Sequence, residues 1–195
     1  MDRTGYYEEV EATLFAGTDP EAYVIWPATT FAAEAAVSIV ADGHAYFARF
    51  ASIEEAIFYR RLNAQAQKPT ASPPISIAKE RLPQDFAKRI VKVWNAVLVR
   101  THPEEKVSNV TDGVGYVFFA DGASGEDANL DCGVGDLMNA SAVKLADLAQ
   151  IPDGGKRHAI QKEIEKILTR IESNDYDRVS KRVSPLASDS DGVRQ

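Results

Sequence analysis

One aromatic stretch, residues 116–119, limits the folds that this chain can adopt. It reads Tyr-Val-Phe-Phe, so a β-strand here would point large apolar side chains to both sides. Asp112-Gly113 precedes it and Asp121-Gly122 follows it, and the pair Asp-Gly favours the tight turn of a hairpin. A strand that is apolar on both faces belongs inside a covered sheet. The region therefore predicts a meander with strands at 107–111, 114–120 and 127–132.

Two amphipathic helices are predicted on either side of this meander in the sequence. Over residues 84–100, apolar side chains recur every three or four positions, and Pro83 suits the first turn of a helix. Over residues 156–172, isoleucines and a leucine keep the same spacing. Each helix therefore has one apolar face that can cover a sheet.

Shorter patterns predict the remaining elements. Ser52 followed by Glu55 is a capping box, which predicts a helix over residues 52–64. Asp42-Gly43 predicts a type I′ turn between two strands of a hairpin, because both central residues of that turn need positive φ. The other predicted elements are helices at 5–16 and 141–149 and strands at 23–26, 35–41, 44–50 and 75–78.

Hairpins, a meander and amphipathic helices together predict an α+β fold, in which an antiparallel sheet packs against helices. A chain of 195 residues fits one domain. We expect this domain to span residues 1–173. Residues 174–195 are polar and poor in apolar side chains, and we expect them to form a weakly ordered tail.

Net charge and cysteine content disfavour several classes of protein. A net charge of -7 argues against general nucleic-acid binding, which depends on a basic surface. No apolar run is long enough to span a membrane, and the N-terminus lacks the basic and apolar regions of a signal peptide. The single cysteine, Cys132, suits a reducing compartment. These features predict a cytoplasmic protein.

Two loop motifs fail when their spacing is tested. A calcium loop counted from Asp121 needs a glycine at position six and a glutamate at position twelve, where Glu126 and Cys132 stand. Gly133-x-Gly135 lacks the third glycine of a dinucleotide-binding loop, and no parallel βαβ unit surrounds it. We interpret these two glycines as turn residues.

The histidines and the cysteine do not form a recognisable site either. His44, His102 and His158 lie far apart in the sequence and none has the spacing of a zinc motif. Cys132 ends a predicted strand among acidic neighbours, which disfavour a thiolate. We therefore predict no catalytic residue, no metal ligand and no cofactor.

Charge is distributed unevenly along the chain. Between residues 107 and 153 the acids far outnumber the bases, whereas residues 79–106 are net basic. The acids around the predicted turns can form a face that attracts a basic partner. The alternative is that aspartate simply suits solvated turns. The predicted partner-binding residues are Asp112, Asp121, Glu126, Asp127 and Asp131.

The run from Trp94 through Asp112-Gly113 to Tyr116 and Phe118 resembles a pattern of small uncharacterised bacterial proteins. In these proteins a helix with a tryptophan precedes an Asp-Gly turn and a Tyr-x-Phe strand. Some small acidic proteins of this kind are immunity proteins of bacterial toxin systems. The resemblance covers about a quarter of the chain and implies a binding role, but it transfers no functional residue.

Two functions from different classes follow as hypotheses. The first is a binding protein of the immunity type, which covers a basic surface of a protein partner with acidic hairpins. The second is a small hydrolase whose carboxylate pair, or histidine and carboxylate, meet only in the fold. Neither hypothesis involves a membrane or a nucleic acid, and self-association is a third alternative that the sequence leaves open.

Overall fold

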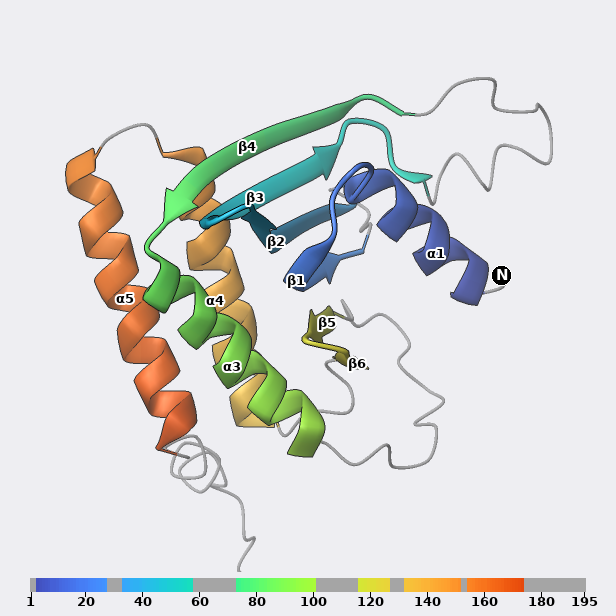
Figure 1. Cartoon of the computed structure of the whole chain (residues 1–195). Coiled ribbons are helices and arrows are strands. Elements are labelled where there is room, and N and C mark those ends of the chain that lie inside the picture. The colour runs from blue at the N-terminus through green and yellow to red at the C-terminus, as the bar shows by residue number, and fades with distance from the viewer. Residues whose placement is uncertain are drawn as a thin grey trace, which may run out of the picture.

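Antiparallel strands form one six-stranded sheet, and helices pack on both of its faces (Figure 1). The computed structural model describes residues 3–27, 33–57, 73–100, 116–126, 132–151 and 154–173. The strands are β1 (Pro20–Trp26), β2 (Ala35–Asp42), β3 (Ala45–Ile53), β4 (Ile75–Leu82), β5 (Val117–Ala120) and β6 (Ala123–Glu126). The helices are α1 (Arg3–Leu14), α3 (Gln84–Arg100), α4 (Cys132–Gln150) and α5 (Gly154–Glu172). The predicted α+β fold is confirmed.

The sheet has the strand order β4-β3-β2-β1-β5-β6, so β1 joins a four-stranded meander to the β5–β6 hairpin. Val24 of β1 pairs with Val37 of β2 on one side and with Phe118 of β5 on the other. Directly paired residues of an antiparallel sheet point to the same face. These three side chains are fully buried and form the centre of one face of the sheet.

The larger core lies between this face and the three helices α3, α4 and α5 (Figure 1). Trp94 of α3 is fully buried and packs in the same cluster as Phe118. Its indole Nε1 donates a hydrogen bond of 3.1 Å to Oγ of Ser141 in α4. The Ser141 hydroxyl in turn donates a 2.7 Å bond to the carbonyl of Met138. Both polar groups are therefore satisfied inside the core.

A smaller core lies on the opposite face, where α1 covers the sheet. Val10 and Leu14 of α1 are fully buried and pack with Ile25 of β1. Tyr23 lies beside this cluster and stacks on Phe119, with ring centroids 4.9 Å apart. Tyr116 and Phe118 pack with the larger core, whereas Val117 packs with the smaller core and Phe119 stacks on Tyr23. The prediction that this stretch points apolar side chains to both faces of the sheet is confirmed.

The long helices agree with their predicted ranges. α3 has the bounds predicted from its apolar stripe, residues 84–100. α5 begins two residues before the predicted range of 156–172 and ends with it. Both helices were readable because their apolar spacing is local. Helix α1 and strands β1 and β4 also occur where elements were predicted, with shifted ends.

The predicted capping box at Ser52 is wrong. Ser52 lies in β3, where it pairs with Ala35 of β2 and with Ser76 of β4. Pairing with strands on both sides overrides a local capping signal that would be adequate for an isolated segment. Helical structure begins only at Ile57, and the rest of the predicted helix, residues 58–64, lies outside the described residues.

The first predicted hairpin exists, but its turn is shifted by one residue. Asp42 pairs with Ala45, so the two turn residues are Gly43 and His44. Of these, only Gly43 has positive φ, at 61°. This pattern is typical of a type II′ turn, not of the predicted type I′ turn. A type I′ pattern occurs instead at Asp121 (φ 46°) and Gly122 (φ 80°), which join β5 to β6.

The predicted meander is wrong, because β5 pairs with other strands than those predicted. β5 pairs with β1 and β6, so both of its edges are occupied and the predicted strand 107–111 is not its neighbour. β6 occupies residues 123–126, which were predicted to be a loop. The predicted strand 107–111 and residues 127–131 of the predicted strand 127–132 lie outside the described residues. Cys132, the predicted end of the third strand, begins α4 instead.

Helix α4 is also longer than the predicted helix at 141–149, and it includes Gly133 and Gly135. The prediction that these glycines occupy a turn is therefore wrong. Glycine disfavours helices by about 1 kcal/mol relative to alanine. The packing of Val134, Leu137 and Met138 into the larger core offsets that cost.

Candidate functional site

The five residues predicted to bind a partner are only partly described. Asp121 is exposed at the tip of the β5–β6 hairpin. Glu126 is the last residue of β6, and its side chain is not described. Asp112, Asp127 and Asp131 lie outside the described residues. The predicted acidic face is therefore represented by one side chain, Asp121.

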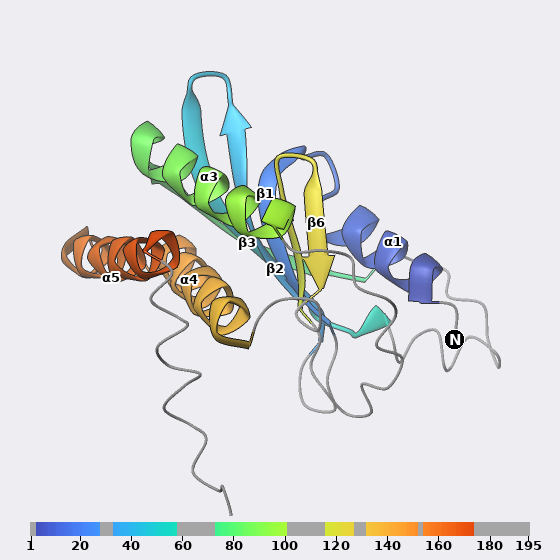
Figure 2. The ribbon, with the colours of Figure 1, turned by 90° about the horizontal axis from the view of Figure 1, so that it is seen from below.

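The structure adds other acids to Asp121 at one end of the sheet. The amide of Asp121 donates a 2.9 Å hydrogen bond to the carbonyl of Glu21, next to the exposed Asp19. Pro20 pairs with Val40, which brings the nearby Asp42 to the same end. Figure 2 shows the tips of the β2–β3 and β5–β6 hairpins on the same side of the molecule. We call Asp19, Glu21, Asp42 and Asp121 the acidic end.

The acidic end is held in place by contacts from the helical side and from the neighbouring strands. Nδ2 of Asn95 in α3 donates to the carbonyls of Ala120 and Asp121, at 2.9 and 3.2 Å. Tyr46 donates its hydroxyl to Glu21 at 3.3 Å. Asp42 has an exposed ion pair with Lys79, at 3.5 Å. Asp19 and Asp121 have no ion pair within the described part of the chain, so their charges remain available at the surface.

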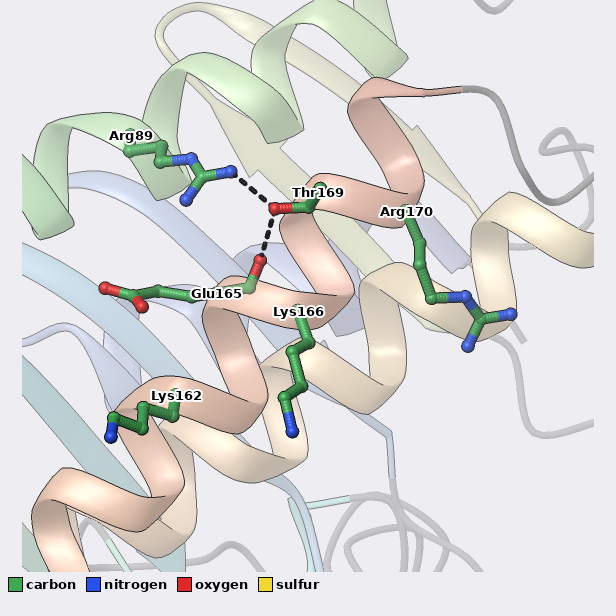
Figure 3. A pocket seen from close by; sticks show the side chains of 6 residues that line it. All are labelled: Arg89, Lys162, Glu165, Lys166, Thr169 and Arg170. Atoms are coloured by element: carbon green, nitrogen blue, oxygen red, sulfur yellow. Dashed lines mark hydrogen bonds between the residues drawn. The ribbon is translucent and has the colours of Figure 1, made fainter.

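A second charged surface, of opposite sign, lies between α3 and α5. It is an open groove of about 560 Å³, and four of its six lining residues are cations. Figure 3 shows that Arg89 comes from α3 and that the other five residues come from α5. The lining residues are Arg89, Lys162, Glu165, Lys166, Thr169 and Arg170. We call this surface the basic groove.

Arg89 is fixed by side chains of α5. Its Nε donates to Oε1 of Glu172 at 3.3 Å, and its Nη2 donates to Oε2 of the same carboxylate at 2.7 Å. Nη2 also donates to Oγ1 of Thr169 at 2.9 Å (Figure 3). The hydrogen bond from Arg89 holds the pKa of Glu172 below its usual value, and the same bond raises the pKa of Arg89. This bidentate pair connects the two helices that form the groove.

The three α5 cations that line the groove differ from Arg89, because within the described residues they have no carboxylate partner of this kind. Lys162, Lys166 and Arg170 are exposed, and no ion pair is present for any of them within the described residues. They follow one another at intervals of four residues, so they lie along one side of the helix. Lys88 and Lys92 of α3 are also exposed. A protein with a net charge of -7 therefore carries a locally basic surface.

The sequence carries a signal for this groove. The spacing of Lys162, Lys166 and Arg170 is readable from the predicted helix 156–172. The basic polar face of the helix at 84–100 was readable as well. The sequence did not reveal that these two basic faces lie side by side. Their proximity depends on the packing of α3 beside α5, which is set by Ile90, Ile164 and other core residues.

Two polar side chains lie deep in the smaller core. Glu34 is fully buried, accepts a 2.8 Å hydrogen bond from the Tyr6 hydroxyl and accepts a 3.0 Å bond from the amide of Ile57. Arg49 is also buried, and its Nη1 donates to the carbonyl of Leu14 at 2.7 Å. Burial lowers the pKa of Arg49. These contacts attach α1 and the segment that follows β3 to the sheet, which is a structural role.

The histidines, for which no metal motif was predicted, lie in separate places. His44 lies in an open hollow of about 430 Å³ with Arg81, Gln84 and Gln161, while His158 is exposed on α5. His102 lies outside the described residues. Within the described ranges, no group of three or more histidine, cysteine, aspartate or glutamate side chains is placed to hold a metal ion. In the same ranges, no helix has the length and apolar character needed to cross a bilayer.

Comparison with protein-family models, with curated proteins and with solved structures finds no match to this chain.

Proposed function

We propose that this chain is a binding protein of the immunity type, which covers a basic surface of a protein partner with its acidic end. The observation that carries the proposal is the convergence of Asp19, Glu21 and Asp121 at one end of the sheet, with Asp42 beside them. Asp121 lies in the β5–β6 turn, Asp42 ends β2, and Asp19 and Glu21 flank the first residue of β1, so the acids come from segments that are separate in sequence.

The physical basis of the proposal is electrostatic attraction between exposed charges. Complementary charges raise the rate at which two proteins associate and narrow the choice of partner. The backbone of the acidic end is fixed by hydrogen bonds, such as those from Asn95 to Ala120 and Asp121, so it needs little ordering on binding.

The hydrolase hypothesis receives less support from the geometry. It requires carboxylates that converge in a hollow, where burial can adjust their pKa values. Glu165 is the one carboxylate in the basic groove, and the hollow beside His44 has none among its lining residues. The acids of the acidic end lie at turns and strand ends instead.

The experiment removes the negative charges of the acidic end while it keeps the turns intact. Asp19, Asp42 and Asp121 are changed together to asparagine, which keeps turn preference because asparagine also tolerates positive φ. The control changes Asp85, Asp136 and Asp147 of α3 and α4 to asparagine, with the same loss of charge. A partner is captured from the native host with the wild-type chain and purified, and its association rate with each variant is measured at low and high salt.

We expect the acidic-end variant to associate about tenfold more slowly at low salt, and the control to change less than about twofold. The salt dependence of the association rate should weaken in the acidic-end variant alone. An immunity protein inhibits the protein that it covers. The proposal therefore also requires that the wild-type chain blocks the activity of the captured partner at equimolar concentration. Equal rates for both variants, or a partner whose activity is unaffected, would contradict the proposal.

A further inference from the structure

We propose that the basic groove between α3 and α5 is a second interaction surface, which binds an acidic polypeptide segment. This surface is distinct from the acidic end and has the opposite charge. The proposal does not depend on the immunity-type function.

Three exposed cations line the α5 side of the groove. Lys162, Lys166 and Arg170 are exposed and have no ion pair within the described residues. Like charges four residues apart on a helix repel one another, and Lys166 also attracts Glu163 on the preceding turn. By contrast, Lys144 of α4 pairs with Glu163 at 2.8 Å, and Arg157 pairs with Glu80 of β4 at 2.8 Å. Lys144 and Arg157, which pair across elements, are thus different residues from the three α5 cations of the groove, whereas Arg89 both lines the groove and connects α3 to α5.

Arg89 provides a preorganised contact at the α3 side of the groove. Glu172 and Thr169 engage its Nε and Nη2, and its Nη1 makes no hydrogen bond within the described residues. Nη1 carries two N–H donors, and a guanidinium held by one carboxylate loses little further entropy when it binds another. A ligand carboxylate can therefore be bound at Arg89 without a rearrangement of the helix pair.

The dimensions of the groove fit a short segment of polypeptide. From Lys162 to Arg170 the helix axis rises by about 12 Å. An extended chain covers that length with about four residues. A segment with several aspartate or glutamate residues can thus approach Lys162, Lys166 and Arg170 in succession.

The charge of the whole chain favours an acidic polypeptide over a nucleic acid. A nucleic acid carries a phosphate at every nucleotide, so its binding strength depends on a broad basic footprint. Here the basic surface is local and the net charge is -7. A short acidic segment interacts mainly with the nearby cations, because exposed charges beyond about 8–10 Å are largely screened by salt.

The experiment uses two probes, hexaglutamate and hexathymidylate, and follows the binding of each to the isotope-labelled full chain by NMR. Lys162, Lys166 and Arg170 are changed together to glutamine in the groove variant. The control changes the exposed Lys79, Arg81 and Lys156 to glutamine, with the same loss of positive charge. All six positions are at the surface, and a urea unfolding curve of each variant verifies that it folds.

We expect hexaglutamate to shift the amide signals of residues 162–170 and of Arg89 and its neighbours. Its dissociation constant should rise about tenfold in the groove variant, as expected for the loss of three exposed ion pairs, and less than about twofold in the control. Variants of the acidic end should bind hexaglutamate at least as well as the wild type, which separates this result from the test of the proposed function. The proposal is overturned by shifts that lie elsewhere, by equal losses in both variants, by no binding, or by tighter binding of hexathymidylate to the same residues.

Discussion

Nη1 of Arg49 donates a 2.7 Å hydrogen bond to the carbonyl of Leu14, the last residue of α1. Arg49 is only 5% exposed, so a buried guanidinium meets the C-terminal end of the helix. The last carbonyls of a helix have no partner within it and carry a partial negative charge. A cation at this point satisfies one of them and attaches the helix to the sheet.

The first prediction concerns this contact. We expect Arg49→Ala to lower the free energy of unfolding by about 3 kcal/mol, because it leaves a buried carbonyl unsatisfied and removes packing. Lys79 pairs directly with Arg49 across β3 and β4 but is exposed, so Lys79→Ala is the matched control. It should cost less than about 1 kcal/mol. Urea unfolding followed by circular dichroism measures both, and similar losses would show that burial of Arg49 is unimportant.

The second prediction concerns Tyr6 and Glu34. The 2.8 Å bond between them is buried, so each side chain should depend on the other. In a double-mutant cycle with Tyr6→Phe and Glu34→Gln, we expect a coupling free energy of about 1 kcal/mol. The pair Tyr46 and Glu21 offers a control, because its bond is longer, 3.3 Å, and only partly buried. A coupling no larger than that of the control pair would contradict the assignment.

The third prediction concerns the ionisation of Tyr23. Its hydroxyl donates to Glu11 at 2.8 Å, and its ring lies 4.6 Å from Phe15 and 4.9 Å from Phe119. Burial raises the pKa of Tyr23 strongly, and the hydrogen bond to Glu11 and its negative charge raise it further. The folded state therefore retains this proton longer than the unfolded state.

The pKa shift of Tyr23 fixes the sign of its effect on stability. Its contribution is fully present below the unfolded pKa of about 10 and is lost as the pH rises toward the higher folded value. In an ultraviolet titration, Tyr23 should ionise after most of the 7 tyrosines of the chain. Tyr23→Phe should remove that late step, and Glu11→Gln should move it to lower pH. An unchanged titration of Tyr23→Phe would refute the prediction.

The parts of the fold that could be predicted from the sequence are those set by local patterns. The apolar stripe of α3 lies within one helix, and its bounds were predicted correctly. Ser52 was misread because its strand is fixed by pairing with Ala35 and Ser76, which are distant in sequence. Gly133 and Gly135 were misread because packing of α4 against the sheet overrides the low helix propensity of glycine.

The candidate surfaces were harder to predict than the elements. The acidic end depends on β1 lying between β2 and β5, a neighbour relation that no local pattern reveals. Of the five acids predicted to act together, Asp121 is the one whose side chain is described, and its neighbours at the acidic end were not among them. The basic groove was partly readable from α5 but required the position of Arg89 on a second helix.

The place of β1 in the sheet also has a consequence for how the chain folds. Strands β1 to β4 are neighbours in both sequence and space, so they can pair as successive hairpins. The β5–β6 hairpin is local as well, but it joins the sheet only when Ala120 meets Ala22, across about half the length of the chain. Closing so long a loop is slow, because its entropy is lost before the contacts form. We therefore expect the docking of this hairpin on β1 to limit the folding rate, and the acidic end to be assembled last.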